Sequence, residues 1–185
     1  MVVGAGAVEA AGATAVGGDT RATGAGTVVT VGDGADGIGT VAFGLPKVDV
    51  VDDFSALFGP PTWRGINRGC GARWTEVVWH DLAAEFRDAT FSGYRYSRNA
   101  RGLFSIVRRP QAPNTTLIPR LATAEGITLG STLAAVRAVY TLHLAGAGKW
   151  HSDNRIVFVS DAQHSPAPLS SRIIEIKSPS TCGDF

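Results

Sequence analysis

Residues 1–37 of this 185-residue chain consist almost entirely of Ala, Gly, Val and Thr, and this composition limits what they can fold into. Of the 23 glycines, 11 lie in residues 1–40, and no aromatic residue, Leu or Ile occurs before Ile38. Such a segment cannot bury enough apolar surface to offset the conformational entropy that its backbone would lose on ordering. We therefore expect a disordered leader with at most one short strand, at residues 27–31.

The charge balance argues against two classes of protein. The net charge of +1 at pH 7 is low for a nucleic-acid-binding protein, which normally contains a clearly basic domain. The chain has no run of about 18 apolar residues, so we expect no transmembrane segment. Residues 1–37 hold one Arg and four carboxylates, a net charge of −3, which leaves +4 for the rest of the chain.

Beyond the leader, one order of expected elements occurs twice along the chain. The first copy has a helix that ends at Gly59, followed by strand-forming segments within residues 74–96. The second copy has a helix that Ser131 or Thr132 would cap, followed by strand-forming segments within residues 155–178. This order indicates a weak internal repeat, seen in the elements more than in residue identity.

These elements predict an α+β fold built from two related halves, each a helical segment packed on an antiparallel sheet. We expect the disordered leader at residues 1–37 and the first helix-plus-sheet half at residues 38–96. A basic, proline-containing connection is expected at residues 97–122, and the second helix-plus-sheet half at residues 123–185.

The sequence contains no motif of a nucleophile elbow, a P-loop or a zinc protease. His151 and Asp153 lie close together in the sequence, but a local turn in which the aspartate bonds to backbone explains them more simply than catalysis does. We therefore expect no enzymatic activity, no cofactor and no metal ion. A small hydrolase that uses His151 and Asp153 with a distant partner is the alternative.

One aromatic and basic cluster has the composition of a binding surface. It consists of Tyr94, Arg95, Tyr96, Arg98 and Arg101. Tyr and Arg are the residue types that most often anchor protein interfaces, so these five residues are the candidate binding patch. The alternative interpretation is an ordinary strand followed by a solvated basic loop.

The two cysteines, Cys70 and Cys182, lie 112 positions apart, with neither a Cys-x-x-Cys spacing nor a nearby histidine pair for zinc. We favour a disulfide bond between them, with two unrelated thiols as the alternative. In the chain-entropy model, closing a loop of this length stabilises a fold by about 4–5 kcal/mol. A disulfide would also imply export to an oxidising compartment.

Several short motifs resemble, in the same order, exported actinobacterial proteins of unknown function. They are GIGTVAFG from Gly37, GPPT from Gly59, VVWHDL from Val77, FSGY from Phe91 and TAEGITLGST from Thr123, together with the two cysteines. The element order of each half is also similar to the tandem units of β-lactamase inhibitory protein and to small outer-membrane assembly lipoproteins. This similarity implies a helix-on-sheet fold and a non-enzymatic role. No segment matches the inserted loop of the inhibitor, so no inhibitory residue is carried over.

We therefore expect a non-enzymatic protein that is secreted or associated with the cell envelope and binds a protein or a cell-wall component. No secretory signal is visible, because no basic residues follow Met1 and Glu9 interrupts the apolar stretch. Either the true start lies upstream of Met1 or the protein is cytoplasmic. A self-associating structural module is a further alternative, and the oligomeric state stays open.

Overall fold

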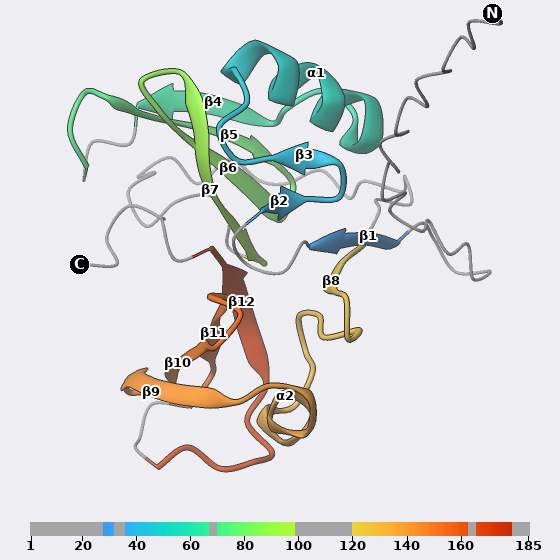
Figure 1. Ribbon diagram of the computed structural model, residues 1–185, viewed down its shortest axis with the longest axis vertical. Helices are drawn as coiled ribbons and strands as arrows, with labels where there is room; N and C mark the ends of the chain where they lie inside the picture. The colour runs from blue at the N-terminus through green and yellow to red at the C-terminus, as the bar shows by residue number, and fades with distance from the viewer. Residues whose placement is uncertain (1–27, 32–35, 67–69, 99–119, 163–165, 179–185) are drawn as a thin grey trace, which may run out of the picture.

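The computed structural model describes residues 28–31, 36–66, 70–98, 120–162 and 166–178. These residues form two β-sheets and two helices (Figure 1). Among them, no helix is both long and apolar enough to cross a membrane.

The larger sheet has eight antiparallel strands in the order β4-β5-β6-β7-β12-β11-β10-β9. Strands β4 to β7 and strands β9 to β12 are each connected in sequence order. The two sets join where β7 pairs with β12, with Tyr96 opposite Ile176. The bounds are β4 Trp63–Ile66, β5 Trp74–Trp79, β6 Leu82–Arg87, β7 Thr90–Ser97, β9 Leu142–Gly146, β10 Lys149–Ser152, β11 Val157–Ser160 and β12 Ile173–Lys177.

The smaller sheet has four short strands in the order β3-β2-β1-β8. They are β1 Val28–Val31, β2 Gly37–Ile38, β3 Val41–Ala42 and β8 Arg120–Thr123. Strands β1 and β8 run parallel, although about 90 residues separate them in the sequence. Strand β1 falls where the sequence predicts a short strand within the leader, and Val29 on this strand is buried in the core.

Two helices, α1 at Lys47–Phe58 and α2 at Leu133–Val139, follow the expected signals at their ends. Helix α1 begins directly after a proline and ends at Gly59, whose φ of +80° is easily adopted only by glycine. The Thr132 hydroxyl caps α2 by accepting a hydrogen bond from the amide of Ala135. Both predicted helices are therefore confirmed.

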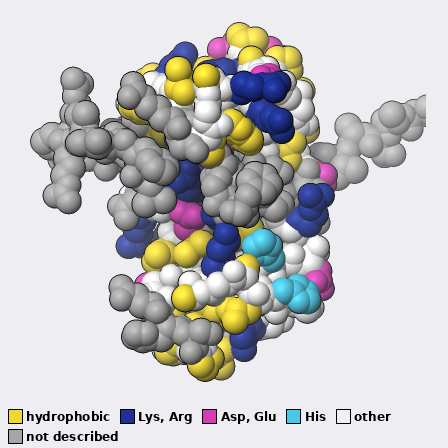
Figure 2. Space-filling model, turned by 90° about the vertical axis from the view of Figure 1, so that its left-hand side faces the viewer, with side chains coloured by type: hydrophobic (Ala, Val, Ile, Leu, Met, Phe, Trp, Pro, Cys, Tyr) yellow, Lys and Arg dark blue, Asp and Glu magenta, His cyan; other side chains and the backbone are white. Residues whose placement is uncertain are grey.

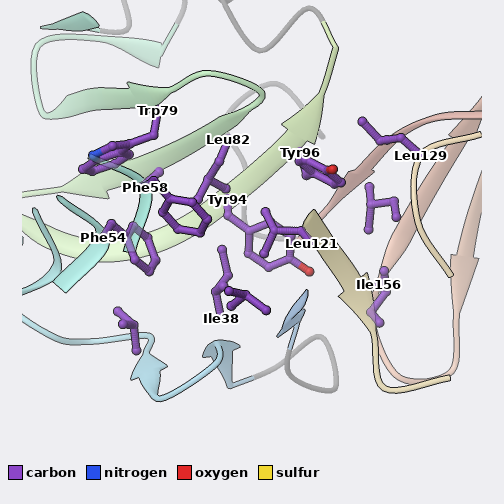
Figure 3. Packing of buried hydrophobic residues seen from close by; sticks show 14 of the residues in the cluster. Ile38, Phe54, Phe58, Trp79, Leu82, Tyr94, Tyr96, Leu121, Leu129 and Ile156 are labelled. Atoms are coloured by element: carbon purple, nitrogen blue, oxygen red, sulfur yellow. The ribbon is translucent and has the colours of Figure 1, made fainter. Parts of the chain in front are cut away.

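One hydrophobic core connects α1, both sheets and α2. Phe54 of α1 packs edge-on against Trp79 of β5, with 5.4 Å between the ring centroids. Figure 3 shows Tyr94 and Leu121 lying between these aromatic rings and Ile156, which belongs to the other end of the cluster. The core therefore extends past the β7–β12 join instead of dividing there.

The predicted fold class is wrong. The described residues are mostly strand, with one continuous eight-stranded sheet, a second sheet and two short helices, and they are not two helix-plus-sheet halves. The error arises because β7 and β12 pair directly, so strands from both parts of the chain share one sheet. The parallel β1–β8 pairing is also absent from the prediction, since local patterns carry no information on such distant partners.

The proposed domain boundaries stay a prediction. Residues 1–27 and 32–35 of the expected leader, and residues 99–119 of the expected connection, lie outside the described part of the chain.

Candidate anion-binding cleft

The aromatic residues of the candidate binding patch lie in the core. Tyr94 is completely buried and stacks on Phe43, with 6.2 Å between the ring centroids. Tyr96 is 8% exposed and belongs to the same core cluster (Figure 3). Burial raises the pKa of both tyrosines, and for Tyr96 hydrogen bonding at Thr128 opposes this rise. Neither ring is available to a partner in this conformation.

Arg95 points to the opposite side of β7, because successive side chains on a strand alternate between faces. Its guanidinium lies 3.0 Å from Glu85 and 3.6 Å from Glu76, which face each other on β5 and β6. Burial by itself would lower the pKa of Arg95, but Glu85, Glu76 and Glu175 together raise it. Arg95 therefore serves an internal ion-pair cluster.

Glu76 is the most perturbed carboxyl group of this cluster. Burial raises its pKa to about 7, Arg95 opposes the rise, and Glu85 adds to it. Its Oε1 atom has no hydrogen-bond partner. Glu76 and Glu85 are only 3% and 1% exposed, so a solute does not reach them in this conformation. We assign the cluster to the stability of the sheet.

Arg98 is exposed and borders an open cleft of about 590 Å³ near the join of β7 and β12. Arg101, the last residue of the candidate patch, lies outside the described residues. The cleft brings together parts of the chain that are distant in sequence, and its lining includes Arg98, Gly130, Asp161, Arg172 and Ile174.

The turn at Gly130 lies beside both arginines. Gly130 has a φ of +89°, and its amide donates a hydrogen bond to the carbonyl of Ile173 at 2.8 Å. Its own carbonyl accepts a hydrogen bond from Nη1 of Arg172 at 2.9 Å. Nη2 of Arg98 lies 4.0 Å from the position that a Cβ atom on Gly130 would occupy. Two guanidinium groups from different parts of the sheet therefore border one glycine.

Asp161 does not neutralise these two cations through a side-chain ion pair among the described contacts. Its Oδ1 accepts a hydrogen bond from the backbone amide of Arg172 at 2.8 Å, and its amide donates to the Arg172 carbonyl at 2.9 Å. Outside this lining, Arg98 lowers the pKa of Asp81, although burial outweighs this effect and raises it. The described lining thus holds two positive charges and one negative charge, and the remaining guanidinium N–H groups suit a bound carboxylate.

Sequence reasoning identifies Arg98 but misses Arg172 and Asp161. Arg172 lies next to a strand end in a segment without any distinguishing motif, and only the β7–β12 pairing brings it near Arg98. The available signal is Gly130, which lies in the TAEGITLGST motif directly before the expected capping residues Ser131 and Thr132. The structure shows that Gly130 lies beside both guanidinium groups.

The structure pairs Asp153 with His143, whereas the sequence suggests a local turn in which Asp153 bonds to backbone. Asp153 Oδ1 lies 2.6 Å from Nε2 of His143, and His143 lies opposite His151 on the neighbouring strand. Figure 2 shows two neighbouring histidine side chains, with an acidic side chain beside one of them. Ser152 lies between His151 and Asp153 in the sequence, and its hydroxyl forms hydrogen bonds with the backbone of Ile156. The hydrolase alternative, which uses His151 and Asp153 with a distant partner, stays a prediction.

The described residues contain no group of three or more His, Cys, Asp or Glu side chains placed to hold a metal ion. Cys70 is half-buried just before β5, whereas Cys182 lies outside the described residues. The Cys70–Cys182 disulfide therefore stays a prediction.

The resemblance to exported actinobacterial proteins and to the fold of β-lactamase inhibitory protein also stays a prediction from the sequence. Comparison with known proteins found no matching family model, no matching curated protein and no matching solved structure.

Proposed function

We propose that this protein is a non-enzymatic binding protein that holds an acidic segment of a protein partner in the Arg98–Arg172 cleft. The observation that carries the proposal is the convergence of two guanidinium groups on Gly130, inside an open cleft of about 590 Å³. Two like charges held close together repel each other, and a bound anion removes that repulsion.

The chemistry of the lining favours a carboxylate next to an apolar side chain. A guanidinium group binds a carboxylate through two parallel hydrogen bonds, and arginine is enriched among the residues that dominate interface energies. Ile174, at the edge of the cleft, is 46% exposed and offers an apolar contact beside the arginines. A peptide in which acidic and apolar residues alternate matches both features.

We also propose that the protein is secreted or located in the cell envelope. This location is supported by the predicted disulfide between Cys70 and Cys182 and by the resemblance of the sequence to exported proteins. Both supports come from the sequence, and the binding proposal does not depend on them.

Fluorescence anisotropy with a labelled peptide of alternating glutamate and leucine tests the binding proposal. We expect saturable binding that weakens about tenfold, or about 1.4 kcal/mol, in Arg98→Gln and in Arg172→Gln. Arg172→Lys keeps the charge but loses the paired donors, so it should bind with intermediate affinity. Arg137→Gln, on α2, is the matched control and should bind like the wild type.

Equal binding by the wild type and both glutamine variants would contradict the proposal. Equal binding of a lysine–leucine peptide would also contradict the proposal, because the cleft would then not discriminate between negative and positive charge. Soluble peptidoglycan fragments should compete poorly. If they bind at the arginines and the acidic peptide does not, the partner is a cell-wall component instead of a protein.

A further inference from the structure

A second cavity, of about 480 Å³, lies between the first half of α1 and the edge strand β4. Its volume falls within the range of about 300–1,000 Å³ typical of small-molecule sites. None of the residues given above for the arginine cleft lines it. We call it the α1–β4 groove.

Backbone hydrogen bonds fix the walls of the α1–β4 groove. The amide of Lys47, at the start of α1, donates to the Ala89 carbonyl at 2.8 Å, which ties the helix to the turn between β6 and β7. Arg64 on β4 lies directly opposite Val77 on β5. Opposite residues on paired strands share a face, and Val77 faces the core under α1. Arg64 therefore projects toward the same side of the sheet as the helix.

Lys47 and Arg64 place two cations in this groove. The Lys47 ammonium donates a hydrogen bond to the Thr75 hydroxyl at 2.9 Å and lies 5.4 Å from the centroid of the Phe86 ring. Burial, and in second place the charge of Arg64, lowers the pKa of Lys47. Asp52 lines the groove as well, but it forms no ion pair with either cation among the described contacts.

Two valines of α1 add an apolar part to the lining of the groove. Val48 is 64% exposed, and a polar side chain at this position would cost the core nothing. Val48 therefore presents an apolar surface at the groove. Val51, one turn further along α1, is buried beneath it and also lines the groove. An exposed valine beside two cations is complementary to a molecule with an acidic end and an apolar chain.

We propose that the α1–β4 groove binds a small amphipathic carboxylate, with its acid group between Lys47 and Arg64 and its apolar chain against Val48 and Val51. This site is separate from the proposed protein-binding cleft, and each proposal can fail without the other.

Isothermal titration calorimetry with octanoate tests the proposal on the full chain. We expect saturable binding of octanoate, and at least about tenfold weaker binding in Lys47→Met and in Arg64→Met. Both variants keep an unbranched apolar side chain, and circular dichroism with thermal unfolding checks that they fold. Arg137→Gln, on α2 and outside the described lining of both sites, is the matched control and should bind octanoate like the wild type.

Three further probes separate charge from apolar contact. Octanol lacks the charge, octyltrimethylammonium reverses it, and inorganic phosphate lacks the chain, so each should bind at least about tenfold more weakly than octanoate. The proposal is overturned if octanoate shows no saturable binding or if any of the three probes binds as tightly as octanoate. It is also overturned if both methionine variants fold and keep the wild-type affinity for octanoate.

Discussion

A buried ionisable side chain costs free energy unless another charge or a set of hydrogen bonds compensates it. Strands β5 to β7 place three such groups together, because Glu76, Glu85 and Arg95 face the same side of the sheet. Arg95 lies 3.0 Å from Glu85 and 3.6 Å from Glu76, so Glu76 is the less well compensated of the two carboxylates. The Oε1 atom without a hydrogen bond and the raised pKa of Glu76 agree with this.

Glu76→Gln should remove a pH-dependent loss of stability. The folded-state pKa is about 7 and the ordinary value is 4.5, so between these pH values the folded state keeps a proton that the unfolded state has released. Wild-type stability should therefore fall as pH rises through this interval, by up to about 3 kcal/mol. The glutamine variant should lack this fall and be the more stable protein at pH 8. Urea unfolding at pH 4, 6 and 8 measures the difference.

Asp53→Asn, on the exposed side of α1, shows the effect of removing one negative charge by itself. If Glu76→Gln and the wild type lose stability equally between pH 4 and pH 8, Glu76 does not carry a proton in the folded protein at pH 6. The ion-pair cluster would then be fully compensated.

The alternation of side chains along a strand distributes the candidate binding patch over the two faces of β7. Tyr94 and Tyr96 occupy one parity of β7 and Arg95 the other, so a two-residue period excludes a common surface for all three. The three residues form one group by composition, but in the structure the two tyrosines belong to the core and Arg95 belongs to the ion-pair cluster. Arg98 reaches the surface because β7 ends at Ser97.

Among the elements, the helices are predictable from the sequence and the sheet pairings are not. Gly59 after α1 and Thr132 before α2 are local signals, and each has its expected role. The sequence allows two registers for β5, and the structure selects Val77 and Trp79 for the core. Val78 is also buried, on the other face, so the usual contrast between a buried and a solvated face is missing from the sequence. Strand β9 escapes prediction because four of its five residues are exposed, and β10 because only Trp150 of its four residues is apolar.

Helix α1 holds the core through Phe54, which is fully buried and contacts Phe58, Trp79 and Phe91. Phe54→Ala should lower the free energy of unfolding by about 3–5 kcal/mol, since it removes a buried ring and leaves a cavity among three aromatic side chains. Leu57→Ala on the same helix is the control, because Leu57 is 44% exposed and its loss should cost less than about 1 kcal/mol. Urea unfolding of both variants measures the two losses, and equal values would show that α1 is not packed as described.

For the molecule as a whole, the parallel pairing of β1 with β8 joins the start of the described chain to residues that follow the 99–119 segment. Composition explains why this pairing is unexpected, because residues 27–31 lie among glycine and alanine and offer little apolar surface. Val29 nevertheless reaches the common core together with Ile38 and Leu121. The effective start of the fold is therefore earlier than Ile38.

Two N-terminal deletions test where the fold begins. Removal of residues 1–35 deletes β1, exposes the core next to Leu121 and leaves β8 without its neighbour, so the free energy of unfolding should fall by at least about 2 kcal/mol. Removal of residues 1–27 keeps β1 and, on the composition of that segment, should leave the unfolding midpoint unchanged. Urea denaturation, monitored by tryptophan fluorescence, compares the stability of both deletion variants with that of the full chain. If the longer deletion is as stable as the full chain, the β1–β8 pairing contributes nothing to the fold. If the shorter deletion is already destabilising, residues 1–27 contribute contacts that their composition does not predict.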